Sequence, residues 1–529
     1  MQLTSPTFFV FISIVIMTYY LIKKEYQWYI LLISSYAFYY LTSPKTLVYL
    51  MITTVSTFLC GIIIDNAKKS KSGTKSPNDE NKNYFQKIYQ FKNIENAAII
   101  VAFLINFGLL AYFKYFATFL ANLEFILGSL ATRSELPLVH LVLPLGISFY
   151  TFQSFGYLID IKRGRIESEK NIAKFALFVS FFPQIIQGPI SRYSELANQL
   201  YEKRKFDYTI FTFGAQLMVW GYFKKFVIAD KLALVVRPIF GNFRDFDGIH
   251  ILVAAIVYSI QIYCDFSGGI DVFRGLAEIL GIILPQNFKR PFFAQSIEDY
   301  WRRWHITLGA WVREYVFFPL SLSKGLSKLG IQLRKVVGNY LGKLIPTFIS
   351  MMVTFLIIGI WHGPQWKYIA FGLYHGSIII LEIMLKPVTR KVFNKIGMRQ
   401  DVFSWRFFKV VLTFLLVSIG RYFSRGDGFR YALRMLKRTF THFNFTGLIF
   451  SNNGALGIDE KDAIVLLISV AVLVFVELLQ ESGIKIRQKI REQNTPFRWL
   501  VYSILILSIL VFGSYGVGYD QQDFIYRGF

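Results

Sequence analysis

Histidine is the side chain most suited to proton transfer near neutral pH, and this 529-residue chain contains six of them. Three lie near the ends of apolar segments or in loops, without other reactive groups close by in sequence, and we expect surface or interfacial roles for these: His140, His250 and His442. The other three occur in motifs rich in tryptophan, arginine or glycine, and they are the candidates for chemistry: His305, His362 and His375.

His305 follows a run of two tryptophans and two arginines, Trp301-Arg302-Arg303-Trp304, and precedes the group Arg313-Glu314-Tyr315. Apolar residues recur here at helical spacing, which predicts one amphipathic helix with the stripe Trp304, Leu308, Trp311, Tyr315 and Phe318. Such a helix could simply lie at the membrane interface, with its arginines on phospholipid headgroups. A functional imidazole is the alternative, and composition alone leaves both interpretations open.

His362 stands at the end of an apolar run, in the sequence Trp361-His362-Gly363-Pro364. Gly-Pro is a strong helix stop, so we expect the helix to end here. A helix that starts near Lys343 would rise roughly 28 Å to His362, which places the imidazole toward the outer half of a bilayer. An ionisable residue at membrane depth indicates function. A polar residue in a short outer turn is the equally weighted alternative.

His375 lies within the next apolar segment. On a continuous helix it would not share a face with His362. Its neighbours Gly372 and Gly376 favour close helix packing through a polar contact.

Two carboxylates, Asp265 and Asp271, flank a Gly-Gly pair. A cation site is one interpretation, and hydrogen-bonded carboxylates at a broken helix are the favoured one. Cys60 and Cys264 both lie in apolar runs without metal-ligand spacing, so we predict neither a metal site nor a disulfide. The motifs of the common soluble enzyme chemistries are absent from the sequence.

The elements that position these residues must be membrane helices. Hydrophobic residues make up 54% of the chain and charged residues 17%, against about 25% charged residues in soluble proteins. The formal net charge is +25, but the basic residues cluster in short gaps between apolar runs. This distribution is typical of cytoplasmic loops in polytopic membrane proteins, and it argues against a nucleic-acid-binding protein.

We therefore predict an all-α, polytopic membrane protein that forms a single membrane domain over residues 1–529, with about a dozen spans. The expected spans are Phe8–Ile22, Trp28–Leu41, Leu47–Ile64, Ala97–Leu120, Leu136–Ile159, Phe175–Ile190, Phe206–Val236, Ile251–Phe266, Pro346–Trp361, Trp366–Leu385, Phe407–Ile419, Ile464–Leu479 and Leu500–Val517. Lys23 and Lys24 place the end of the first span in the cytoplasm. Residues 66–95, rich in Lys, Asn and Ser, read as a flexible basic cytoplasmic loop.

Taken together, the motifs resemble the membrane-bound O-acyltransferase family. The resemblance is carried by Trp-Arg-Arg-Trp-His at 301–305, Arg313-Glu314-Tyr315, Trp361-His362-Gly363 and His375-Gly376, with further matches such as Gln286-Asn287-Phe288. It covers about residues 141–376. It is strongest to the bacterial branch that contains the alginate O-acetyltransferase membrane subunit and the teichoic-acid D-alanyl transfer protein.

The resemblance implies a multi-helix catalytic core over residues 141–376 with a central tunnel, in the bacterial plasma membrane. It implies that His362 and His305 are catalytic. Residues expected to support them or to line the tunnel are His375, Trp301, Arg302, Arg303, Trp304, Arg313, Glu314, Tyr315, Trp361 and Asp265. No permanently bound cofactor and no metal are expected. The donor would be acyl-CoA or an acylated carrier protein.

The activity that the resemblance implies is transfer of an acyl group, with acetyl favoured, from a cytoplasmic thioester to hydroxyls of an extracytoplasmic polysaccharide or envelope glycan. His362 would deprotonate the acceptor hydroxyl, and His305 would either polarise the thioester carbonyl or hold the tautomer of His362. Expected partners are membrane lipid and the glycan, with an acyl carrier protein or an extracytoplasmic transferase as further candidates.

Three alternatives stay open at this point. One is D-alanyl transfer toward teichoic acid. Another is a transporter or flippase for a lipid-linked glycan, and the last is a scaffold that recruits an extracellular transferase. The sequence also departs from the family pattern at Glu314, at Ser321-Leu322, at Phe371 and in the longer, more basic connection Ser323–Leu344.

Overall fold

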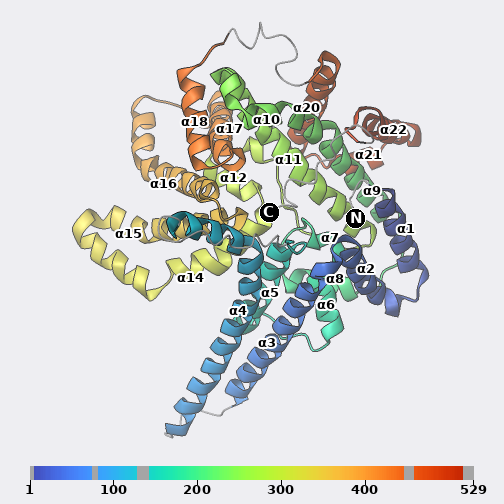
Figure 1. The fold of residues 1–529 in the computed structure, drawn as a ribbon, viewed down its shortest axis with the longest axis vertical. Coiled ribbons are helices and arrows are strands. Elements are labelled where there is room, and N and C mark those ends of the chain that lie inside the picture. Colours follow the sequence, from blue (N-terminus) through green and yellow to red (C-terminus); the bar gives the residue numbers. More distant parts are fainter. Residues whose placement is uncertain (1–4, 74–81, 128–141, 446–457, 516–529) are drawn as a thin grey trace. The chain divides into compact units, whose positions relative to one another are not determined.

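The computed structural model describes residues 5–73, 82–127, 142–445 and 458–515. Helices dominate these residues, and within them the only β-type pairing is an isolated bridge between Phe288 and Trp304. The all-α prediction is therefore confirmed. Figure 1 shows the ribbon with its helices labelled in chain order.

The chain packs as two compact units rather than as one undivided body. The first comprises residues 1–214 and 273–285, and the second comprises residues 215–272 and 286–529. Helices α9 (Tyr208–Tyr222) and α11 (Gly248–Ile279) each contain a boundary between the units.

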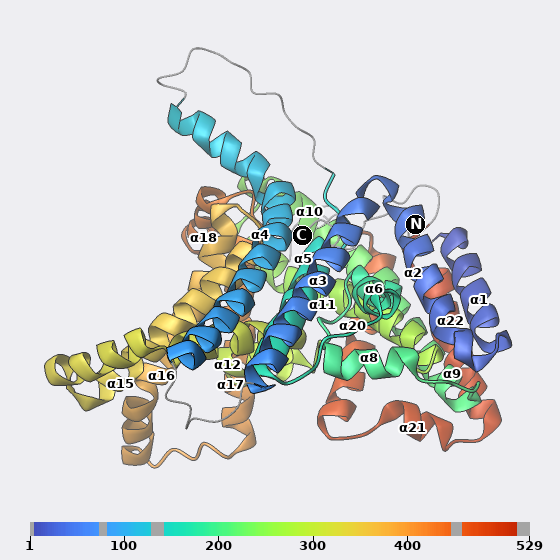
Figure 2. The same ribbon diagram turned by 90° about the horizontal axis from the view of Figure 1, so that it is seen from below.

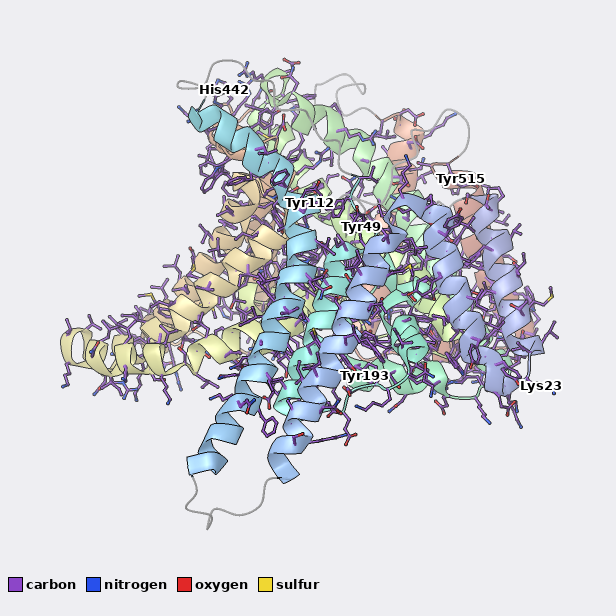
Figure 3. The ribbon with its side chains drawn as sticks, turned by 60° about the horizontal axis from the view of Figure 1, so that its bottom comes forward. Lys23, Tyr49, Tyr112, Tyr193, His442 and Tyr515 are labelled. Carbon is purple, nitrogen blue, oxygen red and sulfur yellow. The ribbon has the colours of Figure 1, made fainter. Side chains whose placement is uncertain are left out.

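The first unit is built mainly from the N-terminal helices. These are α1 (Pro6–Leu21), α2 (Gln27–Thr42), α3 (Leu47–Gly73), α4 (Lys82–Leu127), α5 (Ile147–Arg163), α6 (Ile172–Ser180), α7 (Phe182–Ile185) and α8 (Tyr193–Tyr201). Helices α3 and α4 lie side by side over much of their length (Figures 1 and 2). Lys23, labelled in Figure 3, follows α1 at the turn into α2.

The second unit holds all of the candidate catalytic residues. After the π-helix η3 (Phe223–Ala229) its helices are α10 (Asp230–Gly241), α11, α12 (Ile297–Arg303), α13 (Ile306–Val312), the π-helix η6 (Arg313–Phe317), α14 (Phe318–Ser321), α15 (Lys324–His362), α16 (Trp366–Lys395), α17 (Phe403–Arg425), α18 (Phe429–Thr441), α20 (Glu460–Glu481), α21 (Ile486–Arg491) and α22 (Thr495–Phe512).

Eight of the described helices are long and apolar enough to cross a membrane, fewer than the dozen predicted. They are α3, α4, α11, α15, α16, α17, α20 and α22. The prediction over-counted because several apolar runs are broken. Residues 175–190 form two short helices that meet just before Pro183, and residues 206–236 contain the π-helix η3 with two buried lysines. Part of the predicted span Leu136–Ile159 lies outside the described residues.

The described parts of residues 66–95, for which we predicted a flexible loop, are helical in the structure. Helix α3 continues to Gly73 and α4 begins at Lys82, because a run of Lys, Asn and Glu is compatible with a helix that extends beyond the apolar segment. Residues 74–81 lie outside the described residues.

Helix α15 consists of two helical segments that meet at Gly338, where φ is 84° and the chain turns back (yellow in Figure 1). Glycine tolerates this left-handed conformation without a steric penalty. The two segments pack closely, since a Cβ on Gly330 would lie 3.3 Å from the carbonyl oxygen of Gly342. The second segment runs from Gly338 to His362 and carries the Trp361-His362 motif.

Candidate active site

His305 lies at a sharp turn between two short helices. Helix α12 begins at Ser296, whose hydroxyl accepts a hydrogen bond from the Asp299 amide at 3.0 Å, and it ends at Arg303. His305 then adopts a left-handed conformation, with φ 46° and ψ 52°, before α13 starts at Ile306. The amphipathic helix predicted here is helical from Ile306 to Ser321, but Trp304 lies outside it because the left-handed residue redirects the chain.

The turn is held by the segment that contains Asn287. The Lys289 amide donates to the Arg303 carbonyl at 2.9 Å, and the Ile306 amide donates to the Asn287 carbonyl at 3.0 Å. These hydrogen bonds pair the segment with the chain on both sides of His305. A left-handed non-glycine residue is strained by about 1–2 kcal/mol, so such external contacts are needed to keep it.

The side chain of Asn287 is fully buried, and its Oδ1 atom accepts three hydrogen bonds. The donors are the Thr307 amide at 3.0 Å, the Thr307 hydroxyl at 3.0 Å and Nδ1 of His305 at 3.3 Å. Asn287 occurs in the Gln286-Asn287-Phe288 match to the family, but we did not predict it as a site residue because the sequence does not show its contact with His305.

His362 is the last residue of α15, and Gly363 caps the helix as predicted from the Gly-Pro stop. Its imidazole is buried, and it lies 6.3 Å from the ring of Tyr368 at the start of α16. The backbone of Gly363 passes close to Tyr368, since a Cβ on that glycine would lie 2.6 Å from the tyrosine ring.

Both predicted catalytic imidazoles contact the same indole. The ring centroid of Trp361 lies 5.5 Å from that of His305 and 4.9 Å from that of His362, edge-on in both cases. Trp361 is itself buried. The fold thus brings together two histidines that are far apart in the sequence.

His375 lies on α16 and is linked to His362 through Phe371. Its ring is 4.7 Å from Phe371, which is in turn 5.7 Å from His362. It is parallel to Tyr300 at 6.4 Å and fully buried. Neither ring nitrogen has a hydrogen-bond partner among the described residues. A Cβ on Gly420 of α17 would lie 2.8 Å from its Nε2, so the packing interpretation agrees with this environment.

The two tryptophans of the motif face the buried core. Trp301 lies edge-on to His375 at 5.4 Å, and Trp304 stacks on Tyr300 at 5.6 Å. The guanidinium of Arg421 lies 4.9 Å from the centre of the Trp304 ring. Trp301 therefore packs against His375, and Trp304 packs in the core directly before His305.

The two arginines of the motif point elsewhere. Arg302 is exposed and pairs with Glu298 one turn earlier. Arg303 contacts Asp299 at 3.0 Å and Glu481 of α20 at 3.0 Å, and these carboxylates raise the pKa of Arg303 although its partial burial acts in the opposite direction. Arg303 therefore links α12 to α20.

The group Arg313-Glu314-Tyr315 begins the π-helix η6 rather than a regular α-helix. Arg313 is exposed, and the Tyr315 ring lies 5.1 Å from that of Trp311. The distinct hydrogen-bonding geometry of a π-helix is often found at functional sites.

Asp265 forms an ion pair instead of an open cation site. Its carboxylate contacts the ammonium of Lys225, which also lies 2.9 Å from Asp230. Asp271 pairs in the same way with Lys224 at 2.7 Å. Helix α11 is continuous through both aspartates, so the predicted helix break is wrong while the hydrogen-bonded carboxylates are present. No group of three metal-ligating side chains occurs among the described residues.

Burial determines the protonation state of His305, which lies between α12 and α13, outside the eight candidate spans. Desolvation disfavours the imidazolium and lowers the pKa of His305 to about 3. The ring is therefore neutral at physiological pH. A neutral imidazole has one nitrogen that donates and one that accepts a hydrogen bond.

The described core thus holds two buried imidazoles on one indole, and comparison with known proteins identifies the family. Residues 33–333 match the membrane-bound O-acyltransferase family. The matched segment includes Asn287 and His305 and ends before His362. The chain belongs to this family, and it is a multi-pass membrane acyltransferase. The match extends further toward the N-terminus than the motifs predicted.

Three relatives illustrate the range of the family. The protein named "Probable alginate O-acetylase AlgI" of Pseudomonas syringae pv. tomato is 31% identical over 433 residues, which cover 82% of this chain and 74% of the relative. The peptidoglycan O-acetyltransferase of Helicobacter pylori is 32% identical over 64% of each chain. The teichoic acid D-alanyltransferase of Bacillus subtilis is 28% identical over 54% of this chain and 70% of its own.

Proposed function

We propose that this protein transfers an acetyl group from a cytoplasmic thioester to hydroxyl groups of an extracytoplasmic polysaccharide or envelope glycan. The names of its relatives support acetyl transfer, since those that cover the largest share of the chain are O-acetylases. The observation that carries the proposal is the shared contact of His305 and His362 with Trp361 in the buried core.

In this proposal His362 acts as the general base. The acceptor oxygen attacks the thioester carbonyl carbon while the imidazole takes the hydroxyl proton. The new C–O bond forms, the C–S bond breaks, and the proton passes to the departing thiolate. No covalent enzyme intermediate is required. His305 either polarises the carbonyl or holds His362 in the required tautomer.

The donor would be acyl-CoA or an acylated carrier protein that reaches the site from the cytoplasm, through a tunnel in the helical core. The acceptor would approach from the opposite side. An extracytoplasmic transferase that receives the acetyl group first is a further candidate partner. This arrangement would modify exported glycan without export of the donor.

The proposal is tested with purified protein in liposomes, supplied with a radiolabelled acetyl thioester on one side and a soluble glycan on the other. Wild-type protein should form labelled ester, and His362→Ala should form none above background. His442→Ala is the matched control, because His442 is exposed at the end of α18 (Figure 3). Ester formation by His362→Ala equal to that of wild type would remove the residue from the mechanism.

A second candidate is D-alanyl transfer from a carrier protein toward teichoic acid, which the similarity to the Bacillus subtilis relative supports. The two activities differ in the mass of the ester and in the amine that D-alanine adds. Mass spectrometry of envelope glycan from cells with and without the protein therefore distinguishes them.

A further inference from the structure

The two roles open to His305 require opposite hydrogen-bonding behaviour. To polarise a thioester carbonyl, the imidazole must present an N–H group to the carbonyl oxygen. To hold His362 in the tautomer that can act as a base, it must present a lone pair to the N–H of His362. The tautomer of His305 therefore separates the two roles.

Asn287 determines that tautomer, because the orientation of its amide is fixed independently of the histidine. The Thr307 backbone amide can only donate, and it lies 3.0 Å from the side-chain atom assigned as Oδ1 of Asn287. An amide nitrogen at that position could not accept this hydrogen bond. The Thr307 hydroxyl, also at 3.0 Å, is placed to donate to the same oxygen.

His305 presents Nδ1 to this same oxygen at 3.3 Å. Because the oxygen offers only lone pairs, Nδ1 of His305 must carry the proton. A neutral imidazole with a proton on Nδ1 has its lone pair on Nε2. Burial keeps the ring neutral, as shown above, so the second proton that would make Nε2 a donor is absent at physiological pH.

We propose that Asn287 is a positioning residue that holds His305 in the Nδ1–H tautomer, so that His305 acts in the reaction through Nε2 as a hydrogen-bond acceptor. The inference rests on the proposed function and selects between the two roles given there. His305 is not the group that polarises the thioester carbonyl. It receives a hydrogen bond from the N–H of His362, which leaves the other nitrogen of His362 free to take the hydroxyl proton.

Asn287 also keeps the turn that presents the ring. Its carbonyl accepts the Ile306 amide and its side chain accepts the Thr307 amide, so both residues that follow the left-handed His305 are tied to Asn287. The same residue thus fixes the backbone and the protonation site of the imidazole. Groups that orient a metal-bound imidazole typically change activity by about ten- to a hundredfold when they are removed, and we expect a comparable change for Asn287.

The experiment combines tautomer measurement with kinetics. Nitrogen-15 NMR of histidine-labelled protein in liposomes distinguishes a protonated from an unprotonated ring nitrogen, and the His305 signals are identified by their loss in His305→Gln. We expect the wild-type signal to show protonated Nδ1 and unprotonated Nε2. A protonated Nε2 at neutral pH overturns the proposal, even if every Asn287 variant fails to fold.

Two variants and a control then test the role of Asn287. Asn287→Leu removes the acceptor and should lower kcat about ten- to a hundredfold, with a mixed tautomer signal. Asn287→Asp keeps an acceptor oxygen and should retain both the Nδ1–H signal and more activity than the leucine variant. His442→Ala, at an exposed position at the end of α18, is the control and should keep kcat near that of wild type.

Wild-type kcat in folded Asn287→Leu protein also overturns the proposal. This failure is distinguishable from failure of the proposed function, which would appear as ester formation by His362→Ala. A protein that forms no ester at all, but shows the Nδ1–H signal, would contradict the proposed function and leave the tautomer assignment supported.

Discussion

The guanidinium of Arg421 lies against the face of Trp304, 4.9 Å from the ring centre, and the same side chain donates a hydrogen bond to the Tyr300 hydroxyl at 2.7 Å. Trp304 precedes His305 directly, so this buried arginine supports the turn. No carboxylate pairs with Arg421 among the residues that the structure describes.

Substitution of Arg421 tests this support. Arg421→Met removes the cation–π contact and leaves the buried Tyr300 hydroxyl without its donor, so we expect a loss of about 1–3 kcal/mol in stability. Tyr300→Phe removes only the hydrogen bond and should cost less. Thermal denaturation in detergent measures both. Equal losses would mean that the contact with Trp304 contributes nothing.

Gly420 makes room for His375, because a Cβ at that position would lie 2.8 Å from Nε2. We expect Gly420→Ala to destabilise the protein by about 1–3 kcal/mol through overpacking. His375→Ala should relieve the clash, so the loss in the double variant should be smaller than the sum of the two single losses. Additive losses in denaturation midpoints would show that the two residues do not interact.

Asp265 is expected to contribute to folding rather than to chemistry. Its substitution by asparagine leaves the buried Lys225 ammonium with Asp230 alone, and breaking a buried pair typically costs about 3–5 kcal/mol. The yield of folded Asp265→Asn protein should therefore fall, whereas kcat of the folded fraction should stay near wild type. A large drop in kcat with normal thermal stability would assign Asp265 a direct role.

The two arginines before Trp304 should differ in importance. Arg302 pairs with Glu298 at an exposed helix surface, where such pairs contribute about 0.3–0.5 kcal/mol. Arg303 joins α12 to Glu481 of α20 and is mostly buried, so Arg303→Ala should lower the melting temperature more than Arg302→Ala. The opposite order would contradict the link between α12 and α20.

The depressed pKa of His305 predicts a pH dependence of stability. The pKa is lowered from 6.5 to about 3 by burial, so protonation favours the unfolded chain. The free energy of unfolding therefore has its full value above pH 6.5 and decreases as the pH falls from 6.5 toward 3. His305→Gln lacks this contribution, so the difference in melting temperature between the variant and wild type should change over this pH interval. A difference in melting temperature that does not change with pH would refute the lowered pKa of His305.

The sequence predicted the end of the helix at His362 well because its signals are local. An apolar run followed by Gly-Pro defines both the helix and its end, and the structure has α15 end at His362. The conformation of His305 could not be predicted in this way. Its left-handed turn depends on hydrogen bonds that Asn287, 18 positions earlier in the chain, accepts from the residues of the turn, and no local pattern encodes that contact.

The sequence also did not predict that Phe371 contacts both His362 and His375. Helix periodicity correctly separated the faces of His362 and His375 on a continuous helix, but the chain turns between α15 and α16. The antiparallel return places Phe371 against both imidazoles. The number of spans was over-estimated for a related reason, since apolar composition does not reveal where a short buried helix ends.

The shared indole has a consequence for the maturation of the protein. Trp361 and His362 lie on the last turn of α15, whereas His305 lies on a separate turn that is hydrogen-bonded to Asn287. Neither segment contains both imidazoles. Under the proposed function, a nascent or partly inserted chain would be inert toward cellular thioesters, and reactivity would begin only when the end of α15 docks beside the His305 turn.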